Sequence, residues 1–93
     1  NMTEYEKVEI YNVTNGERFS TYLIAAEAGS KTVSINGAAA HKASPEDIII
    51  ICSYASMHED QMLNHKPTLV YFDETNEIVD IKSSIPTQRI RSL

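Results

Sequence analysis

Hydrophobic and polar residues alternate with a period of two along several short stretches of this chain. That period is typical of β-strands in which one face is covered and the other is open to solvent. Val8 and Ile10 alternate with Glu9 and Tyr11, for example, directly before an Asn-Gly pair. The pattern, together with β-branched composition, predicts strands at residues 8–13, 18–26, 32–35, 68–72 and 77–82.

A sixth strand is predicted at residues 47–54, where the pattern is different. Ile48 to Ile51 is a continuous apolar run without alternation. Such a strand is usually buried on both faces. A barrel or a closed double layer provides that environment, so the run favours a small barrel over an open sheet.

Glycine and proline mark the turns between these segments. Asn15-Gly16 predicts a two-residue type I′ hairpin turn, in which both residues take positive φ. Ala28-Gly29-Ser30, Asn36-Gly37 and Ser44-Pro45 predict further turns.

Two short helical segments complete the predicted elements. Ala38 to His41 is compatible with one helical turn, and Ser56 with Glu59 fits a capping box that opens a helix through Leu63. We therefore expect a small, mainly β fold of six strands with one or two short helices. Residues 1–93 would form a single domain, in which residues 83–93 are a loose or docked tail.

Composition narrows the classes of partner. The 93 residues carry a net charge of −5, which disfavours nucleic acid and anionic membranes as partners and leaves small molecules or other copies of the chain. No apolar run approaches the length that spans a membrane. Cys52 is the only cysteine, so an intrachain disulfide is excluded and a reducing, cytoplasmic location is expected.

The thiol and the imidazoles are weak candidates for chemistry. Cys52 could be a nucleophile only with a base beside it, and a buried core thiol is the simpler interpretation. His58 and His65 lie seven residues apart and could share a helix face. A metal site needs more ligands than these, so we expect surface histidines and no metal.

The segment after Gly16 carries the strongest candidates. On a strand, Arg18, Ser20 and Tyr22 share one face, and Thr21 lies on the other. A guanidinium can bind a carboxylate through two parallel hydrogen bonds, and a phenol can donate a proton. The alternative is an ordinary hairpin with a solvated arginine and a half-buried tyrosine. Small residues after Gly37 would let the backbone approach a ligand closely.

The segments NVTNGERFSTY, INGAAAH, YASM and KPTLVYFDETNEI follow one another from about Val8 to the region of Pro86. In this order they resemble the aspartate 1-decarboxylases, the pyruvoyl-dependent enzymes that make β-alanine for pantothenate synthesis. The resemblance implies a double-psi β-barrel and a homotetramer. It also implies decarboxylation of L-aspartate to β-alanine and CO₂ through a Schiff base to a pyruvoyl group, which acts as the electron sink.

The resemblance also implies roles for individual residues. Arg18 would hold a substrate carboxylate, and Tyr22 would deliver the proton that completes the reaction. The remaining implied residues are Thr21, Gly37, Ala38 and Ala39, which would contact the substrate, and Asn36, which would support the turn from outside that contact layer.

One departure from the family pattern concerns the cofactor. In the family, the pyruvoyl group arises by self-cleavage at a Gly-Ser bond upstream of the region that Val8 begins, and the cleaved N-terminal β chain stays bound as a partner. Gly29-Ser30 is the one Gly-Ser pair here, and it falls after the Tyr22 strand, where a plain turn is the better interpretation. The serine would then lie outside this chain.

Two further observations leave alternatives open. A non-catalytic oligomeric β-barrel that serves as a binding or assembly module would explain a missing cleavage site, whereas a hydrolase or metal protein is poorly supported by Cys52 and the histidines.

A smaller departure is Pro45-Glu46-Asp47, where the family pattern has Gly before the Asp. We expect this change to alter the local turn geometry.

Overall fold

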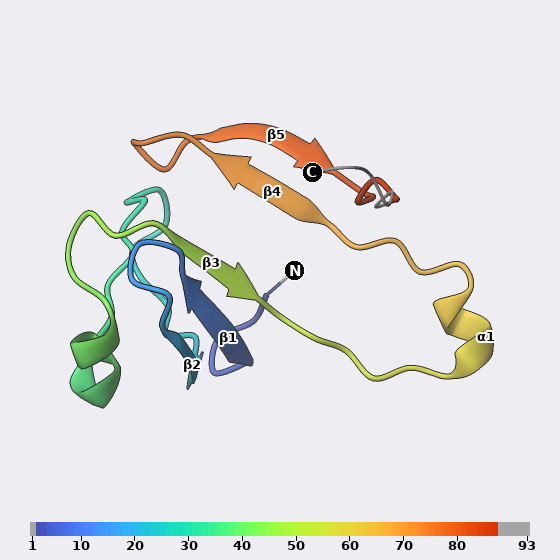
Figure 1. Cartoon of the computed structure of the whole chain (residues 1–93), viewed down its shortest axis with the longest axis horizontal. Coiled ribbons are helices and arrows are strands. Elements are labelled where there is room, and N and C mark those ends of the chain that lie inside the picture. The colour runs from blue at the N-terminus through green and yellow to red at the C-terminus, as the bar shows by residue number, and fades with distance from the viewer. Residues whose placement is uncertain (1, 88–93) are drawn as a thin grey trace, which may run out of the picture. The chain divides into compact units, whose positions relative to one another are not determined.

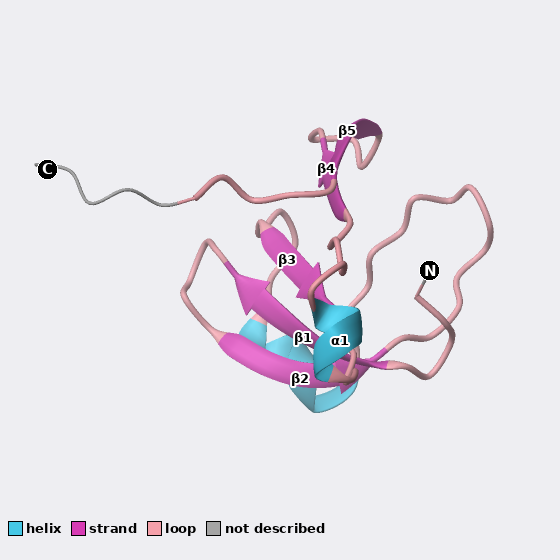
Figure 2. Cartoon of the chain, turned by 90° about the vertical axis from the view of Figure 1, so that its right-hand side faces the viewer, coloured by secondary structure: helices cyan, strands magenta, loops and turns pink. Residues whose placement is uncertain are grey.

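Strands form most of the regular structure in the computed structural model, which describes residues 2–87 (Figure 2). The described part contains five strands, one 3₁₀ helix and one α-helical turn. In chain order these are β1 (Lys7–Asn12), β2 (Arg18–Tyr22), η1 (Gly37–Lys42), β3 (Ile49–Cys52), α1 (Glu59–Met62), β4 (Leu69–Phe72) and β5 (Ile78–Lys82). The mainly β class predicted from the sequence is therefore confirmed.

The residues fall into two units, divided between Ser56 and Met57. The first unit is built on an antiparallel sheet of order β2-β1-β3, with β1 in the centre (Figure 1). The alternation in β1 buries Val8, Ile10 and Asn12 on one face, with Val8 only 1% exposed. This face is the core of the unit.

The hairpin between β1 and β2 is longer than the sequence predicts. The Asn12 amide N–H donates to Glu17 O, and Gly16 N–H donates to Asn12 O, so residues 13–16 form a four-residue loop. Gly16 has φ +79°, but Asn15 is not among the residues with positive φ. The type I′ prediction is wrong because the Asn12 side chain, which accepts from the N–H groups of Thr14 and Asn15, stabilises a different loop.

The isoleucine run is not buried on both faces within the described chain. Ile48 is 66% exposed and Ile50 49% exposed, whereas Ile49 and Ile51 are half-buried. This prediction is wrong for the unit described, because β3 is an edge strand of its sheet and its alternate side chains are exposed.

The predicted strand at 32–35 is also absent from the described structure, where this segment is irregular and mostly exposed. An alternating sequence forms a strand only if a neighbouring strand is available to pair with it, and no described strand pairs with residues 32–35. The helical turn expected at Ala38 to His41 is confirmed as η1, which starts at Gly37 with φ +66°. The turn at Gly29-Ser30 is confirmed as well, with φ +81° at Gly29 and Ser30 N–H donating to Glu27 O.

The second unit contains α1 and the antiparallel β4–β5 hairpin, which has a register irregularity at Tyr71/Phe72. Its helix begins later than predicted: the N-cap is His58, and the Gln61 side chain accepts from His58 N–H. The Ser56/Glu59 capping box is therefore wrong, because Gln61 provides the reciprocal bond two residues further along.

The described strands form one three-stranded and one two-stranded sheet. Closure into a double-psi barrel and the single-domain organisation therefore stay predictions. Of the expected tail at 83–93, residues 83–87 are exposed and irregular, and the remainder lies outside the described residues. No helix in the described part of the chain is long and apolar enough to cross a membrane.

The turn that enters β3 contains a strained residue. Asp47 N–H donates to Ser44 O, and Glu46 lies at the third position of this turn with φ +75°. A type II turn requires positive φ there, and glycine adopts it without a Cβ clash. The sequence departure at Pro45-Glu46-Asp47 therefore leaves a glutamate where the backbone favours glycine.

Replacing this residue, Glu46→Gly, is expected to stabilise the protein by about 0.5–1 kcal/mol, because relief of left-handed strain exceeds the added chain entropy. Urea unfolding of the full-length protein measures the change. Glu46→Ala is the matched control, since it removes the carboxylate but keeps the Cβ. Equal midpoints for the Gly and Ala variants would contradict a backbone origin.

Candidate active site

Strand β2 holds the two side chains with the clearest chemical potential. Arg18, Ser20 and Tyr22 are exposed, whereas Phe19 and Thr21 between them are half-buried. The alternation predicted from the sequence is therefore confirmed, and Arg18 and Tyr22 lie on one face of β2. Ser20 lies between them and donates a 2.6 Å hydrogen bond to Glu9 Oε1 on β1.

The Arg18 guanidinium lies over an aromatic ring. Its central carbon is 4.5 Å from the ring centroid of Tyr11, the residue opposite Arg18 in the β1–β2 register. The ion pairs recorded among residues 2–87 do not include Arg18. A contact through the face of a guanidinium leaves its in-plane N–H groups free to donate hydrogen bonds.

Tyr22 lies at the end of β2, opposite Lys7. Its side chain is 56% exposed, and its ring centroid is 6.4 Å from that of Tyr5 at an interplanar angle of 48°. A phenol this open can reach a ligand bound beside the strand. The other face of β2 carries Thr21, opposite the buried Val8.

Helix η1 contacts β2 and carries the small residues. Gly37 and Ala38 are exposed and Ala39 is half-buried. No atom lies within 4 Å of the place where a Cβ on Gly37 would stand, so the backbone there is open to a ligand. Asn36 accepts a 3.2 Å hydrogen bond from Ser34 Oγ and makes no side-chain bond that caps η1.

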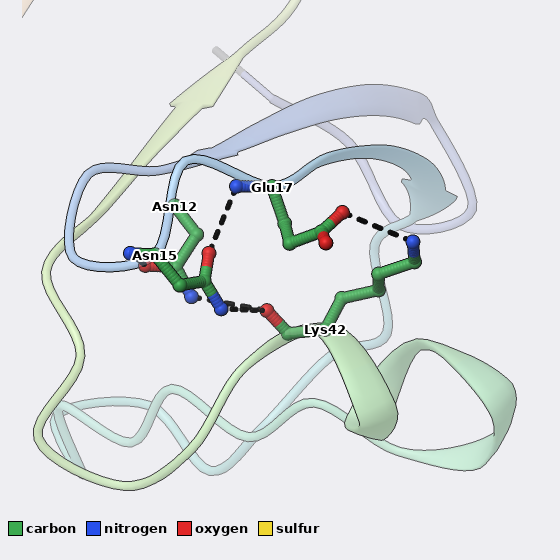
Figure 3. Close-up of polar contacts among 4 residues, drawn as sticks. All are labelled: Asn12, Asn15, Glu17 and Lys42. Carbon is green, nitrogen blue, oxygen red and sulfur yellow. Dashed lines mark hydrogen bonds and ion pairs between the residues drawn. The ribbon is translucent and has the colours of Figure 1, made fainter.

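The position of η1 is fixed by the hairpin loop (Figure 3). Asn12 Nδ2 and Asn15 Nδ2 both donate to the backbone carbonyl of Lys42, at 3.0 and 2.9 Å. Lys42 Nζ forms a 3.0 Å ion pair with Glu17, and Asn15 Oδ1 accepts from Glu17 N–H. The last residue of η1 is thereby held to the loop that leads into β2.

This anchoring places η1 on a particular face of the sheet. Asn12 shares the buried face with Val8 and Ile10, so η1 approaches β2 from the side of Thr21. Arg18 and Tyr22 lie on the other face. The free edge of β2, which is an edge strand of its sheet, borders both faces. A substrate that contacts all of them must therefore bind along that edge.

Sequence reasoning missed the buried member of this network. Asn12 is 2% exposed and makes full use of its amide: Nδ2 donates to Lys42 O and to Asp47 Oδ2, and Oδ1 accepts from two loop N–H groups. The signal was a polar residue in phase with the apolar positions of β1. The bond from Asn12, followed by that from Ser44 N–H, lowers the pKa of Asp47.

The remaining candidates from the sequence are one thiol and two imidazoles. Cys52 is a free thiol that is half-buried rather than buried as predicted, because it lies on an edge strand, opposite Glu9. His58 and His65 are exposed. Within residues 2–87, no group of three or more His, Cys, Asp or Glu side chains is arranged to bind a metal ion.

Comparisons with known proteins point to one family. The family model described as aspartate decarboxylase matches residues 1–79. An aspartate 1-decarboxylase of Alcanivorax borkumensis is 54% identical over 85 residues, which cover 91% of this chain and 68% of the relative.

Two further relatives carry the same name. That of Tolumonas auensis is 55% identical over 87 residues (94% of this chain, 69% of the relative), and that of Hydrogenovibrio crunogenus is 54% identical over 85 residues (91% and 66%). The chain therefore spans about two thirds of the length of these relatives. With a family model that covers most of its length and relatives above 50% identity, this chain belongs to the aspartate decarboxylase family.

Proposed function

We propose that the free edge of β2 is the substrate-binding edge of an enzyme that decarboxylates L-aspartate. The reaction assigned by family membership is the release of CO₂ from aspartate to give β-alanine, which serves pantothenate biosynthesis. The observation that carries the residue assignment is the open arrangement of Arg18 and Tyr22 on one face of one strand. A carboxylate-binding group and a proton donor thereby face the same side of the strand.

Each residue has a distinct role in this proposal. Arg18 binds one carboxylate of the substrate through its in-plane N–H groups and so fixes the orientation of the bond that breaks. Tyr22 donates the proton to the carbon from which CO₂ has left. The residues that complete the contact layer are Thr21, Gly37, Ala38 and Ala39, with Asn36 behind them.

A pyruvoyl group would supply the electron sink, because its carbonyl would accept the electron pair released with CO₂. The residues present fit such a group: Arg18 supplies a cation, and the open backbone at Gly37 leaves room for a ligand. Gly29-Ser30 is an ordinary exposed turn, whose Ser30 Oγ accepts from Thr32 N–H. We therefore assign the pyruvoyl group to a serine outside these 93 residues.

Exposed apolar side chains support the proposed partners. Val79 is 61% exposed and Ile81 60% exposed in the second unit, and Ile24 is 62% exposed in the first. Burial of such surface drives association. We propose that the cleaved N-terminal β chain and the other subunits of a homotetramer cover it, in the cytoplasm.

Mass spectrometry of the native full-length protein, with an assay of CO₂ release from L-aspartate, tests the function. We expect two chains, of which the larger starts with a pyruvoyl group that borohydride or hydroxylamine modifies. Treatment with borohydride should abolish turnover, whereas a mock-treated sample keeps it. An uncleaved protein that binds aspartate but releases no CO₂ would instead favour a non-catalytic binding module.

A further inference from the structure

Three side chains from three segments form a row on the face of the first sheet that is opposite the core. Arg18 on β2 and Tyr11 on β1 are cross-strand partners, and Tyr54 lies two residues beyond the end of β3. The Arg18 guanidinium lies over the Tyr11 ring at 4.5 Å, and the Tyr11 and Tyr54 hydroxyls are hydrogen-bonded at 2.5 Å. The row therefore runs from an exposed tyrosine to the proposed carboxylate-binding group.

Each contact restricts a different motion. A guanidinium stacked on a ring is held in the plane parallel to that ring, and its N–H groups stay free at the edge. The ring itself can tilt about its side-chain torsions unless its far end is held. The hydroxyl of Tyr54 contacts that end through one hydrogen bond, which opposes this tilting.

The bond between the two hydroxyls also affects the pKa of Tyr54. The hydrogen bond with Tyr11, followed by desolvation and the charges of neighbouring titratable groups, raises this pKa to about 12. Although 69% of Tyr54 is exposed, its hydroxyl is engaged with Tyr11 rather than directed only at solvent.

We propose that Tyr11 and Tyr54 are positioning residues that orient Arg18 for the carboxylate of the substrate. This inference rests on the proposed role of Arg18 as the carboxylate-binding residue. Tyr54 lies 32 positions from Tyr22 in the sequence and outside the binding edge. The inference is that Tyr54 affects substrate affinity without contacting the substrate.

Steady-state kinetics of the processed full-length enzyme test this assignment. Tyr54→Phe and Tyr11→Phe each remove one hydroxyl of the same bond, so each is expected to raise KM for aspartate about three- to tenfold with kcat within about twofold. The double variant should equal either single variant, because one bond is lost in all three. Tyr11→Leu, which removes the ring as well, should raise KM further.

Tyr71→Phe is the matched control. Lys82 Nζ lies 5.4 Å from the Tyr71 ring centroid in the second unit, which is a similar cation–aromatic pair that includes none of the residues proposed to bind substrate. This variant should leave KM unchanged.

Arg18→Lys distinguishes the proposed role of Arg18 from the proposed positioning roles of Tyr11 and Tyr54. If this variant leaves KM unchanged, the proposed role of Arg18 is wrong. If Arg18→Lys raises KM but the Tyr54→Phe and Tyr11→Phe variants do not, only the positioning inference is overturned. In the Arg18→Lys background, Tyr54→Phe should add less than about twofold to KM, because the stacked group is no longer a guanidinium. A full additional effect there would identify Tyr54 as a general structural residue and overturn the inference.

Discussion

Tyr22→Phe is expected to lower kcat for aspartate decarboxylation by at least about 100-fold, because general acid catalysis contributes roughly 10²–10⁴ in rate. The substitution removes a single hydroxyl from a side chain that is 56% exposed on β2. KM should change by less than about threefold, because the phenol acts after CO₂ has left and binding depends on Arg18. The measurement is CO₂ release per pyruvoyl group, with the processed fraction determined by mass spectrometry.

The chain offers a close control for this experiment. The Tyr5 ring lies 6.4 Å from that of Tyr22, so Tyr5→Phe removes a hydroxyl from the neighbouring aromatic residue. We expect this variant to keep nearly full activity. If Tyr22→Phe retains more than about half of the wild-type kcat, another group donates the proton.

Asn12→Leu is expected to destabilise the protein by about 3 kcal/mol, because buried polar groups that lose their partners each cost about 1–3 kcal/mol. The substitution removes both donors to Lys42 O and Asp47 Oδ2 and the acceptor for the loop N–H groups. Leucine has as many side-chain heavy atoms as asparagine and a larger volume, so the effect is not that of a cavity. Urea unfolding of the full-length protein at fixed concentration measures the loss.

Asn15→Ala is the matched control, because Asn15 is exposed and donates to the same carbonyl. Its cost should stay below about 1 kcal/mol, since water replaces the lost donor. A loss for Asn12→Leu no larger than that for Asn15→Ala would contradict the importance of the buried amide.

The pH dependence of stability gives a second readout for Asn12. The carboxylate form of Asp47 accepts from Asn12 and Ser44, so its pKa in the folded state is below the ordinary value of 3.8. The stabilisation is therefore fully present above about pH 4 to 5 and is lost as the pH falls through the folded-state pKa. In Asn12→Leu, an NMR titration should show the pKa of Asp47 moving up toward its ordinary value.

The sequence predicted most strands because their patterns are local. Val8 and Ile10 alternate with polar neighbours, and the same alternation separates Arg18 and Tyr22 from Thr21, as the structure confirms. The isoleucine run and the segment at 32–35 were predicted less well. Both depend on which neighbours cover or pair with them, and no local period contains that information.

For the candidate site, the sequence indicates the residue types but not their arrangement. Arg18 and Tyr22 follow from a pattern within five residues, whereas the approach of η1 depends on Asn12, which bonds across 30 positions to Lys42. The Tyr11 to Tyr54 contact spans 43 positions. Contacts of this range are set by sheet register, which a single sequence does not specify.

Helix η1 is held in place through a main-chain oxygen rather than through a side chain. The side-chain amides of Asn12 and Asn15 both donate to the backbone carbonyl of Lys42, a group that every amino acid has. The Lys42 ammonium adds only an exposed ion pair with Glu17. Position 42 should therefore accept many residue types. Substitutions that enlarge the side chains at Ala38 and Ala39 should therefore leave the attachment point of η1 at the Lys42 carbonyl in place.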